Sequence, residues 1–159
     1  MLGLLEHNIM FRGISSATLD SKNRLGLPGR FREALQAYEG KVVVTIDMRE
    51  KCLLLYPLPE WEVVQRKLEA LPNIGEQPRK LQRLLIGHAT DIEIDSQGRI
   101  LLTSMLREFA DLQKKLVLVG QGNKLEIWST DGWQERMSAW LQDDSNLLAE
   151  SDEFTGLSV

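Results

Sequence analysis

The chain has 159 residues, of which 43% are hydrophobic and 26% charged, and its formal net charge is −4. This composition is typical of a soluble globular protein and excludes a disordered chain, and the length allows one domain or two small ones. No apolar run approaches the roughly 20 residues of a membrane-spanning helix, and the start, MLGLLEHNI, lacks the features of a secretion signal. The lone Cys52 excludes an intrachain disulfide and indicates a buried, inert thiol in a reducing compartment.

The acidic charge is concentrated at the C-terminal end. Five acidic residues and no basic residue follow Leu141: Asp143, Asp144, Glu150, Asp152 and Glu153. Without these five, the remaining residues have a net charge of +1, so the body of the chain is open to a local basic face. At the other end, Met10 opens the stretch MFRG, and the nine residues before it read as an extension.

The first predicted elements form a strand, turn, strand and helix. The strand ISSATLD ends at Asp20, and the polar turn SKN contains Asn23, which tolerates positive φ. The strand RLGLP leads into a short helix over FREALQAY, with Pro28 as its start signal. A hairpin of KVVVTI and CLLLYP follows, and the helix EWEVVQRKLEAL after Pro59 closes the series.

The same series then comes a second time. The stretch LPNIGEQPRKLQRLL predicts a boundary with a linker helix beginning near Arg79. After it come the strand TDIEID, a turn SQG with Gly98, the strand RILLT and a helix over LREFADL. The hairpin KLVLVG and LEIWS and the helix GWQERMSAWL after Asp131 complete the second series. His88 is expected at the start of the first of these strands.

Aligning the chain on itself shows that the repetition extends to individual residues. A shift of 75 pairs Asp20 with Asp95, Arg24 with Arg99, Arg32 with Arg107, and the run 42–44 with the run 117–119. A shift of 72 then pairs 53–61 with 125–133. One unit is too small to bury a core alone, so the duplication predicts two units that cover each other around a pseudo-two-fold axis. The shared core is expected to contain Val43, Leu55, Leu118 and Ile127.

The sequence gives no sign of an enzyme or of a bound cofactor. The two histidines, His7 and His88, have no counterpart in the other unit, and a structural or surface role is the favoured reading of His88. Motifs for nucleophilic catalysis, phosphate loops and zinc sites are absent. Asp91, Glu93 and Asp95 alternate as calcium ligands do, but Ser and Leu stand where a calcium loop needs Gly and Glu.

The repeated charged residues carry the functional prediction. For Asp20 and Asp95, the favoured reading is structural, because a turn aspartate accepts backbone N–H bonds and pairs with the arginine. For the basic residues the favoured reading is DNA contact, since guanidinium groups suit phosphate oxygens and guanine edges. The candidate DNA-binding residues are Arg24, Arg99, Arg32, Arg107, Lys22 and Arg30. Gln97 and Met105 replace Lys22 and Arg30 in the second unit, so the second copy is expected to be the weaker one.

These motifs resemble a known family. The order of strand, Asp-x-x-x-Arg, apolar strand, short helix with Arg and hairpin is similar to the swapped-hairpin DNA-binding fold of the AbrB type. Two such units, with MFRG, LLLYPLPEW and QRLLIGHATDIEID, resemble the MraZ family of bacterial regulators over Met10 to about Leu141. The resemblance implies a mainly β fold with short helices (α+β), in which two tandem AbrB-like units form one pseudo-two-fold, β-barrel-like domain. The expected division is a first unit at 14–60, a helix and linker at 61–88, a second unit at 89–133, and a helix end and acidic tail at 134–159.

The resemblance also implies a function. Members of this family bind short direct repeats in the promoter of their own operon of division and cell-wall genes and usually repress it. They form homo-oligomeric rings and are cytoplasmic and nucleoid-associated, and neither a membrane nor a small-molecule ligand is expected. Glu33 and Glu108 stand where related proteins can have a second arginine, which weakens the expected basic patch. A purely protein-binding module, such as the dimerisation half of an antitoxin, is the alternative.

Overall fold

The structure is a computed structural model and describes residues 10–72 and 74–143 of the chain. The proposed extension at 1–9 and the acidic tail from residue 144 lie outside the described residues. None of the described helices is long and apolar enough to cross a membrane.

Each half of the chain supplies four strands in the same order. In the first half these are β1 (Ile14–Thr18), β2 (Arg24–Gly26), β3 (Lys41–Ile46) and β4 (Leu53–Pro57). In the second half they are β5 (Thr90–Glu93), β6 (Arg99–Leu101), β7 (Lys115–Gly120) and β8 (Leu125–Ser129). The helices are α2 (Gly29–Gln36), α3 (Leu58–Glu69), α4 (Glu76–His88), α5 (Ser104–Phe109) and α6 (Thr130–Gln142).

Local sequence signals fix the starts of these helices. Pro28 precedes α2, and Pro57 precedes α3, which begins one residue before Pro59. Thr103 accepts a hydrogen bond from the backbone N–H of Leu106 at the start of α5, and Ser129 accepts one from Gly132 at the start of α6. The linker helix α4 begins at Glu76, three residues earlier than expected, and it ends at His88, which was expected in a strand.

The two units exchange strands. Six strands form one antiparallel sheet in the order β1-β7-β8-β4-β3-β5, so β1 pairs with the hairpin of the second unit and β5 with that of the first. Strands β2 and β6, one from each unit, form a separate two-stranded ribbon. In this pairing each unit leaves strand edges that the other unit completes. The α+β class and the two tandem units are therefore confirmed.

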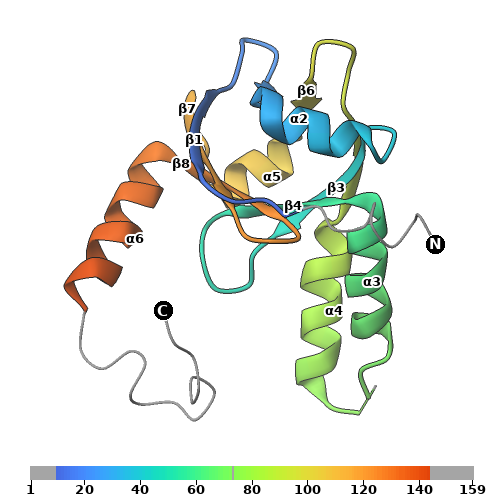
Figure 1. The fold of residues 1–159 in the computed structure, drawn as a ribbon. Coiled ribbons are helices and arrows are strands. Elements are labelled where there is room, and N and C mark those ends of the chain that lie inside the picture. Colours follow the sequence, from blue (N-terminus) through green and yellow to red (C-terminus); the bar gives the residue numbers. More distant parts are fainter. Residues whose placement is uncertain (1–9, 73, 144–159) are drawn as a thin grey trace, which may run out of the picture.

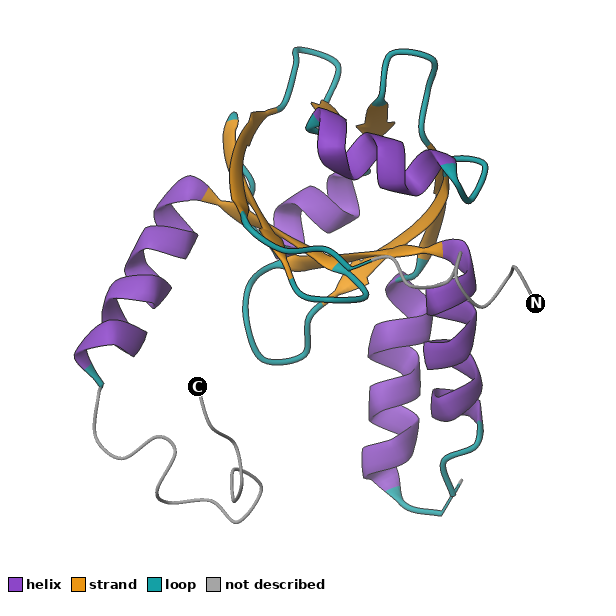
Figure 2. Ribbon diagram, viewed as in Figure 1, coloured by secondary structure: helices purple, strands orange, loops and turns teal. Residues whose placement is uncertain are grey.

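The sheet is open, which differs from a barrel. Strands β1 and β5 are its two edges and are not paired with each other. The six strands curve instead around helices α2 and α5 and the β2–β6 ribbon, which fill the concave side (Figure 2). Helices α3 and α4 and helix α6 extend away from the other side (Figure 1). A helix layer, rather than closure, thus covers the concave apolar face of the sheet.

The main core lies between the concave face and its covering elements. Leu25 and Ile100 of the ribbon and Leu35 of α2 are fully buried there, together with Leu55 and Ile127 of the central strands. Leu118 belongs to the same cluster. Val43 is buried as expected, but it lies on the opposite face with Tyr56 and Trp61, under α3 and α4.

The strand register corrects the alignment of the two hairpins by one residue. Val42 lies opposite Pro57, and Leu116 lies opposite Ser129, the residue equivalent to Pro57 under the shift of 72. Val42 is therefore equivalent to Leu116 and not to Val117, so the shift in this strand is 74. The alignment of 42–44 with 117–119 was wrong here because it matched identical valines that face opposite sides of the sheet.

Candidate nucleic-acid interface

The two Asp-x-x-x-Arg turns, at residues 20–24 and 95–99, lie at the same end of the molecule. They project above the ribbon of β2 and β6, on the side opposite α3, α4 and α6 (Figure 1). In the ribbon, Arg24 pairs with Leu101 and Arg99 pairs with Gly26. The exchange of strands therefore brings together two motifs that are 75 residues apart.

Each aspartate organises its own turn. The Asp20 carboxylate accepts hydrogen bonds from the backbone N–H groups of Lys22 and Arg24, both at 2.9 Å. Its other oxygen accepts one from Nε of Arg24 at 2.8 Å. Asn23 has φ 63°, and its counterpart Gly98 has φ 77°, as a tight turn of this kind requires.

The second turn repeats this geometry. Asp95 accepts from the backbone N–H groups of Gln97 and Arg99, both at 2.9 Å, and from Nε of Arg99 at 3.0 Å. The backbone N–H of Arg24 is the main cause that lowers the pKa of Asp20, and that of Arg99 lowers the pKa of Asp95. Both carboxylates are therefore charged at neutral pH and hold their arginines in place.

The two motif arginines differ in how freely they can bind a ligand. In Arg24 the aspartate binds Nε, which leaves the two Nη groups of the fork for other partners. In Arg99, Nη1 also lies 3.8 Å from the Asp20 carboxylate, so this arginine is held between two acids. The Arg99 side chain is 26% exposed, against 30% for Arg24. Arg24 is thus the better placed of the two to bind a phosphate or a base edge.

The helix arginines approach the turns in two different ways. Arg32 of α2 crosses to the second turn, where Nη1 donates to the carbonyl oxygen of Gln97 at 3.2 Å. Arg107 of α5 donates from Nε to the carbonyl oxygen of its own Leu102 at 3.1 Å. It lines a hollow of about 480 Å³ beside the first turn. The walls of this hollow also include Ser21, Asn23 and Lys114.

The structure separates the remaining two candidates. Lys22 is exposed within the first turn. Arg30 lies instead beside β1, where Nη2 donates to Oγ of Ser15 at 2.9 Å and the guanidinium stacks on the ring of Phe31 at 4.5 Å. Lys114 was not among the predicted residues, because it precedes β7 far from either motif, and only the exchange of strands brings it to the first turn.

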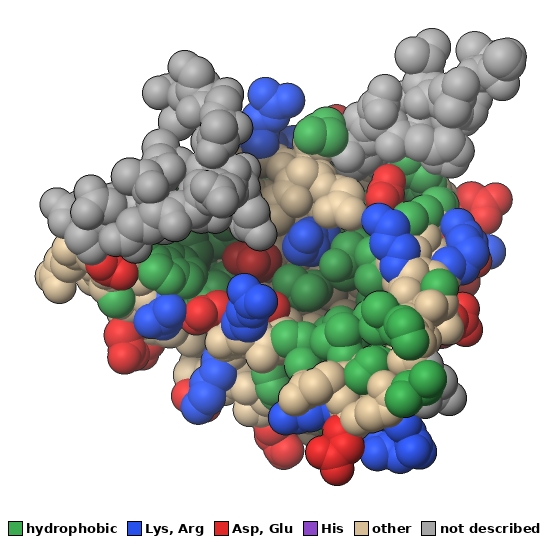
Figure 3. Space-filling view, turned by 90° about the horizontal axis from the view of Figure 1, so that it is seen from below, with side chains coloured by type: hydrophobic (Ala, Val, Ile, Leu, Met, Phe, Trp, Pro, Cys, Tyr) green, Lys and Arg blue, Asp and Glu red, His purple; other side chains and the backbone are tan. Residues whose placement is uncertain are grey.

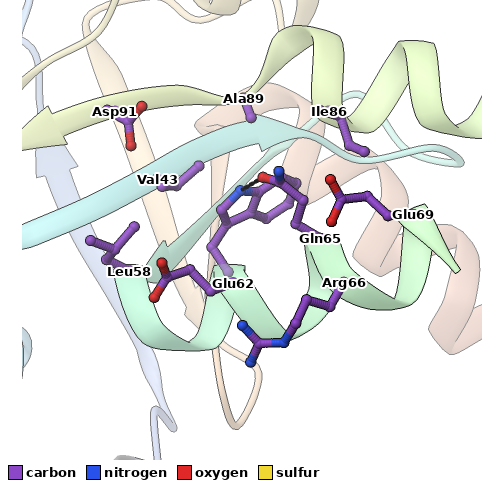
Figure 4. Close-up of a pocket in the computed structure, with 10 residues that line it drawn as sticks. Val43, Leu58, Glu62, Gln65, Arg66, Glu69, Ile86, Ala89 and Asp91 are labelled. Carbon is purple, nitrogen blue, oxygen red and sulfur yellow. Dashed lines mark hydrogen bonds between the residues drawn. The ribbon is translucent and has the colours of Figure 1, made fainter.

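A second concave surface is formed by β3 and helices α3 and α4, and its rim is acidic. This cleft of about 420 Å³ has an apolar floor that includes Val43 and Trp61, whose Nε1 donates to Gln65 at 2.9 Å. Figure 4 shows Glu62, Glu69 and Asp91 around it. Three carboxylates against the single guanidinium of Arg66 disfavour a phosphate, so this cleft does not extend the basic surface of the turns.

One group of side chains has the composition of a metal site. Within residues 10–72 and 74–143, potential ligand atoms of Asp47, Cys52 and Glu126 lie within 4.8 Å of one another. Burial raises the pKa of Cys52 and that of Glu126, which favours protonated forms over metal ligands. Cys52 Sγ already lies 3.6 Å from Asp47, and Trp128 donates to Glu126 at 2.9 Å. These contacts fit a structural role in the small core beside α6.

His88 also has a structural environment. Its Nδ1 lies 2.7 Å from the carbonyl oxygen of Leu84 at the end of α4, and its ring packs near that of Phe109 at 6.3 Å.

The exchanged strands and paired turns define a two-unit swapped-hairpin protein with a preorganised basic edge. Comparison with known proteins gives the family. The model of the MraZ protein, described as antitoxin-like, matches twice, at residues 10–84 and 85–153, and the chain belongs to the MraZ family.

Relatives that carry the name transcriptional regulator MraZ match most of the chain. One from a Marinomonas species is 55% identical over 86% of this chain and 91% of its own length. Relatives from Halorhodospira halophila and Thioalkalivibrio sulfidiphilus are 49% and 46% identical, over 89% and 94% of this chain and 93% and 100% of their own lengths. Because these relatives are named regulators, the expectation that the chain is not an enzyme is confirmed.

Proposed function

We propose that the protein is a DNA-binding transcriptional regulator that recognises repeated boxes upstream of its own division and cell-wall operon and represses it. One observation carries the proposal: the ends of the β2–β6 ribbon hold two arginines, each oriented by a turn aspartate, side by side on one surface. In this proposal the units at 14–60 and 89–133 each supply one turn, the segment 61–88 joins them, and the segment 134–159, a helix end and acidic tail, supplies no DNA contact.

The geometry supports a division of labour among the basic residues. Arg24 has only its Nε bound to Asp20, which leaves its two Nη groups for a bidentate contact to guanine. Lys22 lies in the first turn and Arg107 and Lys114 lie beside it, and all three suit phosphate oxygens. Because Asp20 fixes Arg24 before DNA arrives, little side-chain entropy is lost on binding.

A homo-oligomer, in the form of a ring, belongs to the same proposal. One module presents few basic residues, so its affinity for one box is low. Several modules on evenly spaced boxes gain about 10² to 10⁴ in avidity. Figure 3 shows broad hydrophobic areas on the side opposite the turns, where α3 and α4 and α6 lie. Exposed apolar side chains on this side include Val63 of α3, Ile74 in the connection between α3 and α4, and Trp140 and Leu141 of α6, and they supply a surface for contact between copies that leaves the turns free. A protein with this function is expected to be associated with the nucleoid.

The second candidate is a module that binds only protein, with the assembly as its product. The exposed apolar residues of α6 favour it, and so does the antitoxin-like description of the family. Salt dependence separates the two candidates. Contacts between arginines and phosphates weaken steeply as salt rises, whereas apolar association does not.

The experiment is a titration of the full-length protein against the DNA directly upstream of its own start codon, with a scrambled fragment of equal length and composition as control. We expect a specific shift whose log affinity falls linearly with log salt. Equal binding to both fragments, or no binding at low salt, would contradict DNA recognition. Size-exclusion chromatography with light scattering on the same samples tests the oligomer.

A further inference from the structure

The outer face of the β2–β6 ribbon presents an exposed apolar residue next to Arg24. Leu25 and Ile100 point inward and are fully buried, so the alternate positions form the outer face. These positions are Arg24 and Gly26 on β2 and Arg99 and Leu101 on β6. Leu101 is 54% exposed and lies directly across from Arg24.

The two ends of the ribbon carry different residues beside their arginines, and packing does not explain the difference. Leu101 stands next to Arg24, whereas the pseudo-symmetric position next to Arg99 is Gly26. A Cβ at Gly26 would meet no atom within 4 Å, and its φ is not in the positive range that favours glycine. A side chain at position 26 would therefore fit. Even so, only the end of the ribbon with Arg24 carries an apolar side chain beside its arginine.

This combination has a counterpart in the major groove of DNA. A two-stranded ribbon fits the groove, a guanidinium fork binds guanine, and an apolar side chain contacts the C5-methyl group of thymine. No base other than thymine presents a methyl group there. Resting on the DNA-binding function proposed above, we infer that Leu101 contacts the methyl group of a thymine next to the base bound by Arg24. The other end of the ribbon, formed by Arg99 and Gly26, has no apolar side chain and therefore no preference for thymine.

Replacement of thymine by uracil removes the methyl group and leaves the base pairing unchanged. The upstream fragment is amplified once with thymidine and once with deoxyuridine triphosphate. Wild type, Leu101→Gly and Leu101→Ser are titrated on both DNAs by fluorescence anisotropy. Leu101→Gly copies the natural state of position 26, and Leu101→Ser keeps a side chain in the strand in case glycine loosens the ribbon.

We expect wild type to lose about fourfold in affinity on uracil DNA for each methyl group that Leu101 contacts, the change that corresponds to burial of one methyl-sized group. Both variants should bind the two DNAs with nearly equal affinity, close to that of wild type on uracil DNA.

Three results overturn the inference. The first is equal binding of wild type to both DNAs. The second is that the variants keep the wild-type ratio of affinities for the two DNAs. The variants can also change the oligomer size while the ratio persists, which assigns Leu101 to contact between copies. Preference for upstream over scrambled DNA is measured in parallel, so that wild type that binds specifically but ignores the methyl groups contradicts this inference and leaves the proposed function standing.

Discussion

The guanidinium of Arg32, on the helix of the first unit, lies directly against Gly98 in the turn of the second. Its Nη1 donates to the carbonyl oxygen of Gln97 at 3.2 Å, and a Cβ at position 98 would overlap Cδ of Arg32. Gly98 therefore meets two requirements, a positive φ and the close approach of an arginine from the other unit. The first turn uses Asn23 at the equivalent place.

Gly98→Ala should destabilise the protein more than Asn23→Ala does. Gly98→Ala introduces a side chain at positive φ, at a cost of about 1–3 kcal/mol, and also displaces Arg32 and its hydrogen bond, whereas Asn23→Ala only exchanges one side chain at positive φ for another that tolerates it less well. Urea unfolding of both variants measures the difference. In the Arg32→Ala background the difference between the two costs should shrink by the part that Arg32 causes, and an unchanged difference would show that Arg32 does not contribute to it.

The turns should also make stability depend on pH in the acid range. The pKa of Asp20 and that of Asp95 are lowered in the folded state by the backbone N–H groups of Arg24 and Arg99. Their contribution to stability is therefore present above the unfolded pKa of about 3.9 and is lost as pH falls through the lower folded pKa. A variant with both Asp20→Asn and Asp95→Asn should be less stable at neutral pH and should lose less stability on acidification. Urea unfolding between about pH 6 and pH 2.5 checks this, and parallel curves for wild type and variant would contradict it.

The core gives a prediction with a larger effect on stability. Leu55 is fully buried in the strand that pairs with β8 at the centre of the sheet, so Leu55→Asp places an unpaired charge in the main core. We expect a loss of more than about 4 kcal/mol and a chain that does not fold. Ile14→Asp is the matched control, because Ile14 is 57% exposed on the edge strand β1 of the same sheet and should tolerate the charge. Circular dichroism and size-exclusion chromatography of both variants decide the matter, and a folded Leu55→Asp protein would place the strand elsewhere.

Local signals predicted most elements of the fold, because turns and helix starts depend on neighbouring residues. Asn23 and Gly98 act in the turns where the sequence placed them, and Pro28 precedes α2 as expected. The register within β3 did not follow from the sequence. Residues 42–46 are buried on both faces, by the main core and by α3 and α4, so they show no alternation that would assign Val43 to one face.

The candidate site was predictable within each unit but not between units. The spacing of Asp20 and Arg24 is a local feature, and it recurs as expected in Asp95 and Arg99. The contact of Arg32 with the second turn and the position of Lys114 depend on which strands pair across the two units. Nothing in the local sequence of either residue carries that information, because long-range pairing is fixed by the packing of the whole core.

The contribution of single charges to DNA binding gives the next prediction. The sequence predicts that Lys22 and Arg30 both face DNA, but the structure distinguishes them. Both residues are exposed, but Lys22 lies in the first turn, whereas Arg30 is bound to Ser15 and stacked on Phe31 beside β1. Lys22→Ala should therefore reduce the slope of log affinity against log salt by up to about 0.9 for each engaged subunit, while Arg30→Ala leaves it nearly unchanged. Anisotropy titrations at four or more salt concentrations measure both slopes. A larger effect of Arg30→Ala would place the DNA along β1 instead of over the turns.

Arg24 should act on discrimination between DNA sequences rather than on salt dependence alone. Asp20 holds its Nε and leaves the two Nη groups for a base edge, so Arg24→Ala should reduce the preference for the upstream fragment over scrambled DNA by about 1–3 kcal/mol per recognised base. Arg99→Ala should have a smaller effect, because Nη1 of Arg99 is also drawn toward Asp20. The folded state should survive both changes, since each arginine is partly exposed and a surface ion pair contributes little to stability. Titrations of both variants on both DNAs, with thermal melts as the control for folding, test the assignment. If Lys22→Ala loses the preference while Arg24→Ala keeps it, the two side chains have the opposite roles, with the lysine at the bases and the arginine at the phosphates.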